Sequence, residues 1–270
     1  MVKREYLRNA SFSLNSIWKN LVLYLPDLAF FVGTFLLALL FLKINNLTSL
    51  LGGQLDTFSS QLRSISISGS LLFRLIVSFV VLIIVNVAFG ISAVTLRLYM
   101  VRGIIRKEKV TLWKFWKDSQ SYVMPVFWLK LCLFFIYLIP VIVLIGIGLL
   151  YQQLILIMIL LVLIIFIMLK FVFLFSYATL LLKNLRNPIT ALQSTANYFN
   201  QNKGTVILVG VIVFAVNLII SGIISLAPIF WNSLNYTGII TVSIVLYILI
   251  KALVDITVNV WSNIFIFKNY

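Results

Sequence analysis

Residues 187–226 read NPITALQSTANYFNQNKGTVILVGVIVFAVNLIISGIISL, a short amphipathic stretch that runs directly into a long apolar one. Asn187 suits the cap of a helix, and Pro188 suits its first turn, where the missing N–H costs nothing. Apolar side chains then recur at helical spacing as far as Phe199, opposite amide side chains. This stretch is shorter than the roughly 20 apolar residues that a bilayer requires. The pattern predicts a helix in the membrane interface, followed by a transmembrane helix.

The same pattern occurs twice more. One copy begins near Tyr6 and one near Thr111, each before a long apolar run. A helix breaker follows each copy at a comparable place, Pro26, Pro125 or Gly204. Unrelated amphipathic connectors are the alternative, but three copies at matching places favour internal triplication. The predicted units, each an interfacial helix plus a two-span hairpin, cover about residues 6–98, 111–182 and 188–267.

The chain has the composition of a membrane protein. Of its 270 residues, 63% are hydrophobic and 10% are charged, and its mean hydropathy is +1.15. Continuous apolar runs predict helices and exclude a β-barrel, whose strands would alternate. We therefore expect one all-α domain, residues 1–270, with six transmembrane helices as three hairpins, each preceded by a cytoplasmic interfacial amphipathic helix. The predicted spans are about 21–42, 71–98, 123–150, 154–182, 205–226 and 238–267.

Lys and Arg residues indicate the orientation. They cluster before the first span, between the second and third spans, and between the fourth and fifth, whereas the other loops are nearly bare. By the positive-inside rule, both termini are cytoplasmic in a multi-pass protein of the cell membrane. The net charge of +15 also suits nucleic acid, but no soluble segment is long enough to bind it. Anionic lipid headgroups are the expected partner of this charge.

The first outer loop is long and rich in serine. Leu51, Leu55, Phe58 and Leu62 step by four, three and four residues, so they share one helical face. We expect a short helix on the outer membrane surface there, and a mobile loop is the alternative.

Side chains that commonly take part in catalysis are scarce in this sequence. The chain has no histidine, six acidic residues and one cysteine. It therefore lacks the usual general base and the commonest metal ligand. We expect a protein that is not an enzyme, with no catalytic residues, no metal ligands and no cofactor.

Charged residues inside the predicted spans form the first candidate site, because a charge in hydrocarbon is costly and indicates function. They are Asp27, Lys130, Lys170, Lys251 and Asp255. In one interpretation, Lys251 pairs with Asp255 across one helical turn, and Asp27 pairs with a lysine of the third or fourth span. In another, these residues line a cationic cavity in the cytoplasmic half of the bundle, which suits an anionic headgroup or a small anion. A proton relay through the two aspartates is the third.

The middle amphipathic stretch holds the second candidate site, a cytoplasmic docking face. It combines aromatic anchors with positive charge in Trp113, Lys114, Trp116 and Lys117. This face favours a non-enzymatic accessory or scaffold subunit that docks a protein partner of a membrane complex, or anionic lipid. The alternative function is a small transporter or lipid-handling protein that uses the cationic cavity.

The layout resembles a known group of proteins. With segments such as SLNSIWKN at residues 13–20 and NPITALQS at residues 187–194, it is similar to a broad group of six-span prokaryotic membrane proteins. The group includes the membrane domain found beside glycerophosphodiester phosphodiesterases, and related uncharacterised bacterial and archaeal families. The resemblance covers nearly the whole chain. It implies no phosphodiesterase activity, because that membrane domain is not the catalytic part and these 270 residues leave no room for one.

Overall fold

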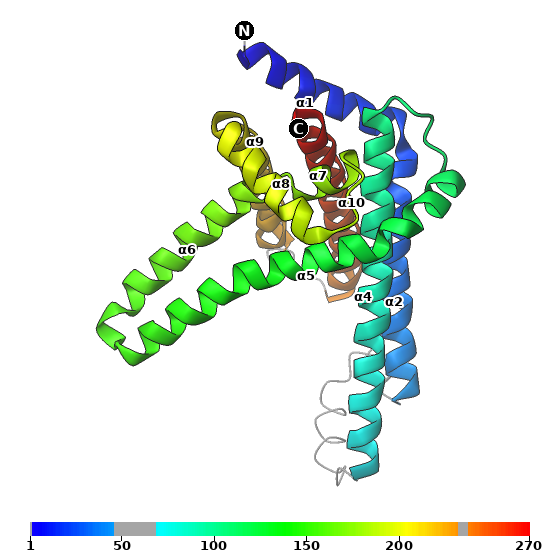
Figure 1. Cartoon of the computed structure of the whole chain (residues 1–270). Coiled ribbons are helices and arrows are strands. Elements are labelled where there is room, and N and C mark those ends of the chain that lie inside the picture. Colours follow the sequence, from blue (N-terminus) through cyan, green and yellow to red (C-terminus); the bar gives the residue numbers. More distant parts are fainter. Residues whose placement is uncertain (1, 46–68, 232–236) are drawn as a thin grey trace. The chain divides into compact units, whose positions relative to one another are not determined.

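The structure is a computed structural model that describes residues 2–45, 69–231 and 237–270, nearly all of them helical (Figure 1). The helices are α1 (Val2–Lys19), α2 (Leu25–Ile44), α4 (Gly69–Ile105), α5 (Leu112–Leu150), α6 (Ile155–Val172), α7 (Ser176–Leu182), α8 (Pro188–Gln201), α9 (Lys203–Trp231) and α10 (Thr237–Asn269). Two 3-10 helices, η1 (Leu21–Tyr24) and η3 (Gln152–Leu154), connect α1 to α2 and α5 to α6. The helix predicted around residues 51–62 lies outside the described residues.

Six helical segments of the described chain are long and apolar enough to cross a membrane. They are Leu21–Ile44, Leu72–Ile105, Leu112–Leu150, Ile155–Leu182, Lys203–Ser225 and Leu246–Asn269. These segments match the predicted spans. In the first five, at most 11% of the apolar window is buried inside the protein, so lipid must cover the rest. The predicted all-α, six-span class is confirmed, and the chain is a multi-pass integral membrane protein.

The chain divides into two compact units. Unit 1 comprises Met1–Tyr24 and Thr95–Tyr270, and unit 2 comprises Leu25–Val94. The predicted triplication into units of one hairpin each, within a single domain of residues 1–270, stays a prediction.

Unit 2 is a hairpin of α2 and the first part of α4, in which aromatic rings lie over glycines. A Cβ on Gly33 would collide with the Phe89 ring, and one on Gly90 would lie 3.0 Å from the Phe30 ring. The two rings meet edge to face, with 5.8 Å between their centroids. Small residues that let helices approach closely are the usual means of association in lipid.

In unit 1, α1 packs a face of small polar residues against α10. Ser13 is fully buried, and Asn9 donates a hydrogen bond of 2.8 Å to the side-chain oxygen of Asn269. By contrast, Leu7 and Leu14 are 72% and 50% exposed. The side of α1 that carries Leu7 and Leu14 therefore faces away from the protein, as expected for a helix in the membrane interface, whereas Ile17 near its end is buried.

The third amphipathic helix, α8, begins as predicted. The side-chain oxygen of Asn187 accepts a hydrogen bond of 2.9 Å from the backbone N–H of Ile189, and Pro188 is the first helical residue. Farther along, Thr195 donates a hydrogen bond of 3.1 Å to Thr179, and both hydroxyls are buried. This bond joins α8 to α7.

The first and third amphipathic helices end in the same way. An asparagine follows the last residue of α1 and of α8. The side-chain N–H groups of Asn20 and Asn202 donate to the carbonyl oxygens of Ser16 and Tyr198, at 2.9 and 3.3 Å. Helix ends leave carbonyls without helical partners, but the Tyr198 carbonyl also accepts a hydrogen bond of 2.9 Å from the Asn202 backbone N–H. Asn45, Asn217, Asn263 and Asn269 make the same contact to the carbonyl four residues back, so this geometry does not by itself indicate a repeat.

The middle copy differs, because its amphipathic stretch continues into the span. α5 passes through Pro125 without a break. An interior proline removes one backbone hydrogen bond, which neighbouring groups in a membrane protein often replace. Phe115, at the start of α5, is 1% exposed, and its ring meets that of Tyr99 edge to face at 5.8 Å. This packing holds the stretch against the last turns of α4.

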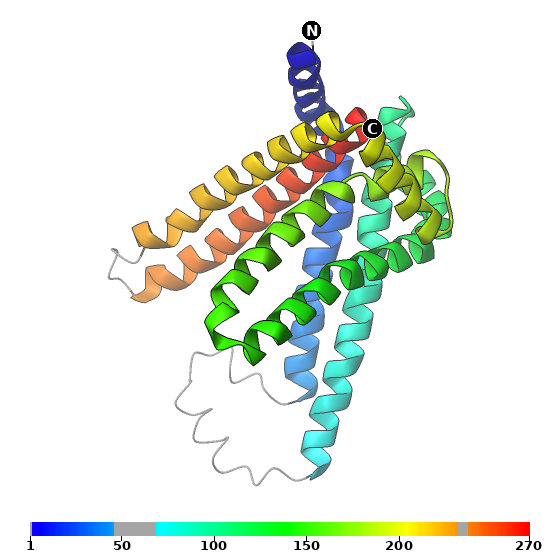
Figure 2. The ribbon, with the colours of Figure 1, turned by 60° about the vertical axis from the view of Figure 1, so that its left-hand side comes forward.

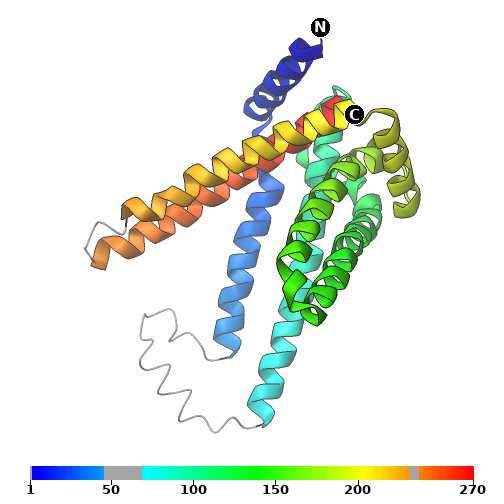
Figure 3. The same cartoon turned by 90° about the vertical axis from the view of Figure 1, so that its left-hand side faces the viewer.

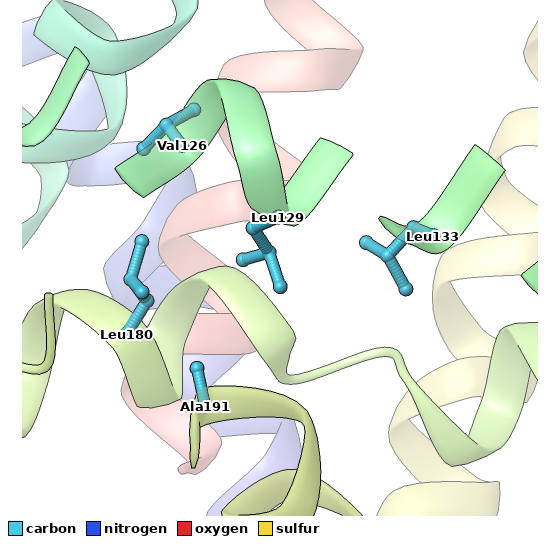
Figure 4. Close-up of a cluster of buried hydrophobic side chains, with 5 residues drawn as sticks. All are labelled: Val126, Leu129, Leu133, Leu180 and Ala191. Carbon is cyan, nitrogen blue, oxygen red and sulfur yellow. The ribbon is translucent and has the colours of Figure 1, made fainter. Parts of the chain in front are cut away.

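The core of unit 1 joins α5 to α7 and α8. Val126, Leu129 and Leu133 step by three and four residues along α5, so they share a face. Leu180 of α7 and Ala191 of α8 lie opposite that face (Figure 4), and all five side chains are buried. The other two spans of unit 1, α9 and α10, run side by side (Figures 2 and 3).

The contact at Phe115 gives a test of the packing. A Cβ at Gly103 of α4 would lie 2.5 Å from the Phe115 ring, whereas one at Gly146 of α5 would meet nothing within 4 Å. Because the ring is buried, we expect Gly103→Ala to destabilise the protein by about 1–3 kcal/mol. The control, Gly146→Ala, should leave stability unchanged or raise it slightly, since alanine favours helix. Thermal unfolding in detergent measures both, and equal unfolding temperatures would contradict this account.

Candidate functional site

A pocket of about 580 Å³ with both polar and apolar lining residues lies in unit 1, where α5, α6, α7, α9 and α10 all contribute to it. Its charged residues are Lys130 of α5 and Lys170 of α6, two of the predicted site residues from different spans. Its other polar residues are Tyr137, Tyr177, Asn217, Asn259, Ser262 and Asn263. None of the described residues that line it is acidic. We call it the lysine pocket.

The core of unit 1 forms one wall of the lysine pocket. Four side chains belong both to the apolar cluster or its edge and to the pocket lining, namely Leu133, Tyr137, Phe173 and Tyr177. Lys130 directly follows Leu129, which is buried in that cluster. Successive helical residues project about 100° apart, so burial of Leu129 directs Lys130 to the side of the core. The lysine therefore stands on a helix whose rotation is held by packing.

A break in the fourth span shapes the same pocket. A turn at residues 173–175 separates α6 from α7, although no proline or glycine lies there. The Ser176 hydroxyl donates a hydrogen bond of 2.7 Å to the Phe173 carbonyl. Phe175 is fully buried, and its ring lies 5.3 Å from that of Tyr198 on α8. This contact with a distant segment stabilises the turn, so the unbroken apolar run in the sequence predicts one helix where the structure has two.

The amide and hydroxyl groups of the pocket come from α9 and α10. The side-chain N–H of Asn217 donates to the Val213 carbonyl at 2.7 Å and lies 3.4 Å from the Ser262 hydroxyl. The side-chain N–H of Asn263 donates to the Asn259 carbonyl at 2.7 Å. Within the described residues, the Asn259 amide makes no hydrogen bond, which leaves it able to bind a ligand.

The two lysines have no anionic partner among the described residues of unit 1. Lys130 and Lys170 are both exposed, and the Lys170 ammonium lies 4.7 Å from the centroid of the Phe166 ring. A cation–π contact of an exposed lysine contributes about 0.5–1 kcal/mol. A lysine at the centre of a membrane-spanning helix costs roughly 2.5–3.5 kcal/mol. The aromatic contact offsets only part of this cost, so water or an anion at the ammonium groups would stabilise them.

The remaining predicted intramembrane charges do not line this pocket. Lys251 and Asp255 are exposed on α10, and they do not form an ion pair with each other in the described structure. Asp255 precedes Asn259 by four residues, so it shares a helical face with a pocket residue. Asp27 lies half-buried in the first turn of α2, in unit 2. Its predicted pairing with a lysine stays a prediction.

The predicted docking face is exposed at the start of α5. Trp113 is 82% exposed and Trp116 is 40% exposed, and Lys114 and Lys117 are exposed between and beside them. Phe115 points the other way, into the protein, as its burial shows. The face therefore presents two indole rings and two ammonium groups to the surroundings of the described chain.

One buried arginine, in contrast to the exposed lysines, contacts the end of α7. Arg102 of α4 is 8% exposed, donates a hydrogen bond of 2.6 Å to Asn184, and lies 4.8 Å from the centroid of the Tyr99 ring. Arg106 donates a hydrogen bond of 3.1 Å to the Leu182 carbonyl at the end of α7. Cations are stabilised at helix C-termini. These arginines therefore help to secure the end of α7, while Nη1 of Arg102 is buried without a hydrogen-bond partner in the described structure.

Sequence reasoning selects the two lysines but not their neighbours. Tyr137 and Tyr177 carry no sign of a shared site, because tyrosines are common in spans and these two come from different helices. The α10 asparagines do leave a sign, since Asp255, Asn259 and Asn263 repeat at intervals of four residues.

None of the family models, curated proteins or solved structures compared with the chain matches it.

Water should reach the lysine pocket. In a Cys132→Ser background, cysteines at positions 130 and 170 should react with a charged, membrane-impermeant thiol reagent in proteoliposomes, because the reactive thiolate forms in water. The control is Leu160→Cys on α6, where the leucine is 55% exposed and outside the pocket. If positions 130 and 170 react no faster than position 160, the pocket is dry.

Proposed function

We propose that this integral membrane protein binds an anionic phosphate group in the lysine pocket, either the headgroup of an anionic lipid or a free phosphate compound. One observation carries the proposal. Lys130 and Lys170 come from separate spans to line one pocket, and the described residues of unit 1 supply neither lysine with an anionic partner. An anion that enters the pocket supplies the missing counter-charge.

Phosphate chemistry fits the groups in the pocket. Ammonium groups donate charge-assisted hydrogen bonds to phosphate oxygens, and such bonds are about twice as strong as neutral ones. The Asn259 amide can add a further donor. The volume of about 580 Å³ lies within the range of roughly 300–1,000 Å³ that is usual for small-molecule sites. A lipid headgroup or a small phosphate ester is of suitable size.

The proposed role is lipid handling or transport, without covalent chemistry. The chain has no histidine, and no carboxylate is among the described residues that line the pocket. The side chains that most often transfer protons in catalysis are therefore missing from it. The basic segments that bound the spans would add attraction for anionic lipid on the predicted cytoplasmic side.

The docking face supports a second candidate, an accessory or scaffold subunit. Its observation is the exposure of Trp113 beside Lys114 and Lys117. Tryptophan is enriched both at membrane–water interfaces and at the centres of protein interfaces. The same four residues could hold α5 at an anionic membrane surface or bind an acidic protein partner.

Native mass spectrometry in detergent with equal amounts of phosphatidylglycerol and phosphatidylcholine tests the first proposal. The wild type should retain phosphatidylglycerol preferentially. The variant Lys130→Gln/Lys170→Gln should lose at least about tenfold in affinity for it, because charge-assisted hydrogen bonds are removed. The matched control, Lys109→Gln/Lys203→Gln, removes two exposed charges outside the pocket and should bind as the wild type does.

Two outcomes separate the candidates. Equal lipid retention by the pocket variant and its control would exclude the lysine pocket as the phosphate site. If instead Lys114→Glu/Lys117→Glu abolishes lipid retention or membrane localisation, the docking face is the principal site and the second candidate is favoured.

A further inference from the structure

A second cavity, of about 910 Å³, runs between α6 and α9 and continues from the lysine pocket. Four residues line both cavities, namely Lys170, Leu174, Val213 and Asn217. Lys170 is the one charged residue among the described residues that line the second cavity. We call this cavity the α6–α9 groove.

The groove is closed at one end and open at the other. A Cβ at Gly210 would lie 2.5 Å from the Phe171 ring, so α6 and α9 touch there. A Cβ at Gly222 would meet nothing within 4 Å, although Gly222 also lines the groove. The two helices thus leave free space beyond the lysine pocket, on the side away from the basic start of α9.

The character of the lining changes along the groove. Near the lysine pocket it carries Lys170 and Asn217, and toward the middle of α6 it carries Leu163, Phe166 and Ile167. On α9, the lining extends from Asn217 to Ser225, which is about 12 Å at the helical rise. A polar, cationic end therefore passes into a mainly apolar channel, in which Ser221 and Ser225 are the other polar residues of the lining.

We infer that the α6–α9 groove holds an acyl chain of an anionic lipid whose phosphate lies between Lys130 and Lys170. The inference rests on the proposed function and selects its lipid form over a free phosphate compound. A cationic pocket joined to an apolar groove is complementary to one amphiphile, with a negative head and a hydrocarbon tail. A free phosphate ester would occupy the lysine pocket and leave the groove without a ligand.

Gly222 offers a way to fill the groove without disturbing the pocket. Because nothing lies within 4 Å of its added Cβ, Gly222→Trp should place an indole in the space of the acyl chain. The control is Gly146→Trp on α5, which is equally open and lines neither cavity. Two probes distinguish the parts of the ligand: dioleoylphosphatidylglycerol in neutral detergent micelles, and glycerol phosphate, which has no tail.

Titration calorimetry of the full-length variants gives the test. We expect Gly222→Trp to weaken binding of the lipid at least about tenfold and to leave binding of glycerol phosphate unchanged, which also shows that the variant is folded. Gly146→Trp should change neither. Lys130→Gln/Lys170→Gln should weaken binding of both probes.

Failure of the acyl-chain inference and failure of the proposed function would give different results. If Gly222→Trp binds the lipid as tightly as the wild type does, the groove holds no acyl chain, while loss of both probes in the lysine variant still supports the proposed function. If the lysine variant binds both probes normally, the proposed function fails. If the wild type is a dimer and Gly222→Trp a monomer, a second copy of the chain occupies the groove and the inference is wrong.

Discussion

The hydrocarbon layer leaves polar groups no partner outside the protein, and this constraint governs the whole molecule. Backbone groups meet it through continuous helices. Where a helix ends or breaks, a side chain bonds a backbone carbonyl: Asn20 and Asn202 after the amphipathic helices, and Ser176 at the turn in the fourth span. The charged side chains of the spans are under the same constraint. For Lys130 and Lys170, the described residues of unit 1 supply no counter-charge, and this makes the two lysines the centre of the proposed site.

Two features of the fold shape the proposed site: α5 packs closely against α7 and α8, and α6 and α9 leave space between them. Burial of Leu129 and its neighbours against α7 and α8 fixes the rotation of α5 and the direction of Lys130. The turn before Ser176 redirects the chain just beyond Lys170. Contact of α6 with α9 at Gly210 closes one end of the groove, and the open space at Gly222 leaves the other end accessible to lipid. A packed core thus forms one wall of the proposed binding site.

Local signals made much of the fold predictable. Long apolar runs define the six spans, and the cap of α8 at Asn187 depends on adjacent residues. The break at residues 173–175 was not predictable, because it depends on Phe175 meeting Tyr198 from another helix. The proposed site likewise has some features that follow from local sequence and others that depend on tertiary contacts. Sequence alone treats all intramembrane charges alike, and only the folded chain separates the two pocket lysines from Lys251 and Asp255. The exposure of Trp113 follows from burial of Phe115, which is again a tertiary contact.

An experimental structure in lipid nanodiscs that contain phosphatidylglycerol and phosphatidylcholine tests the central claim most directly. The account predicts density for a phosphate group between the Lys130 and Lys170 ammonium groups, with a tail that continues along α6 and α9. A structure in which both lysines are paired with carboxylates, in a closed pocket without lipid, would contradict it.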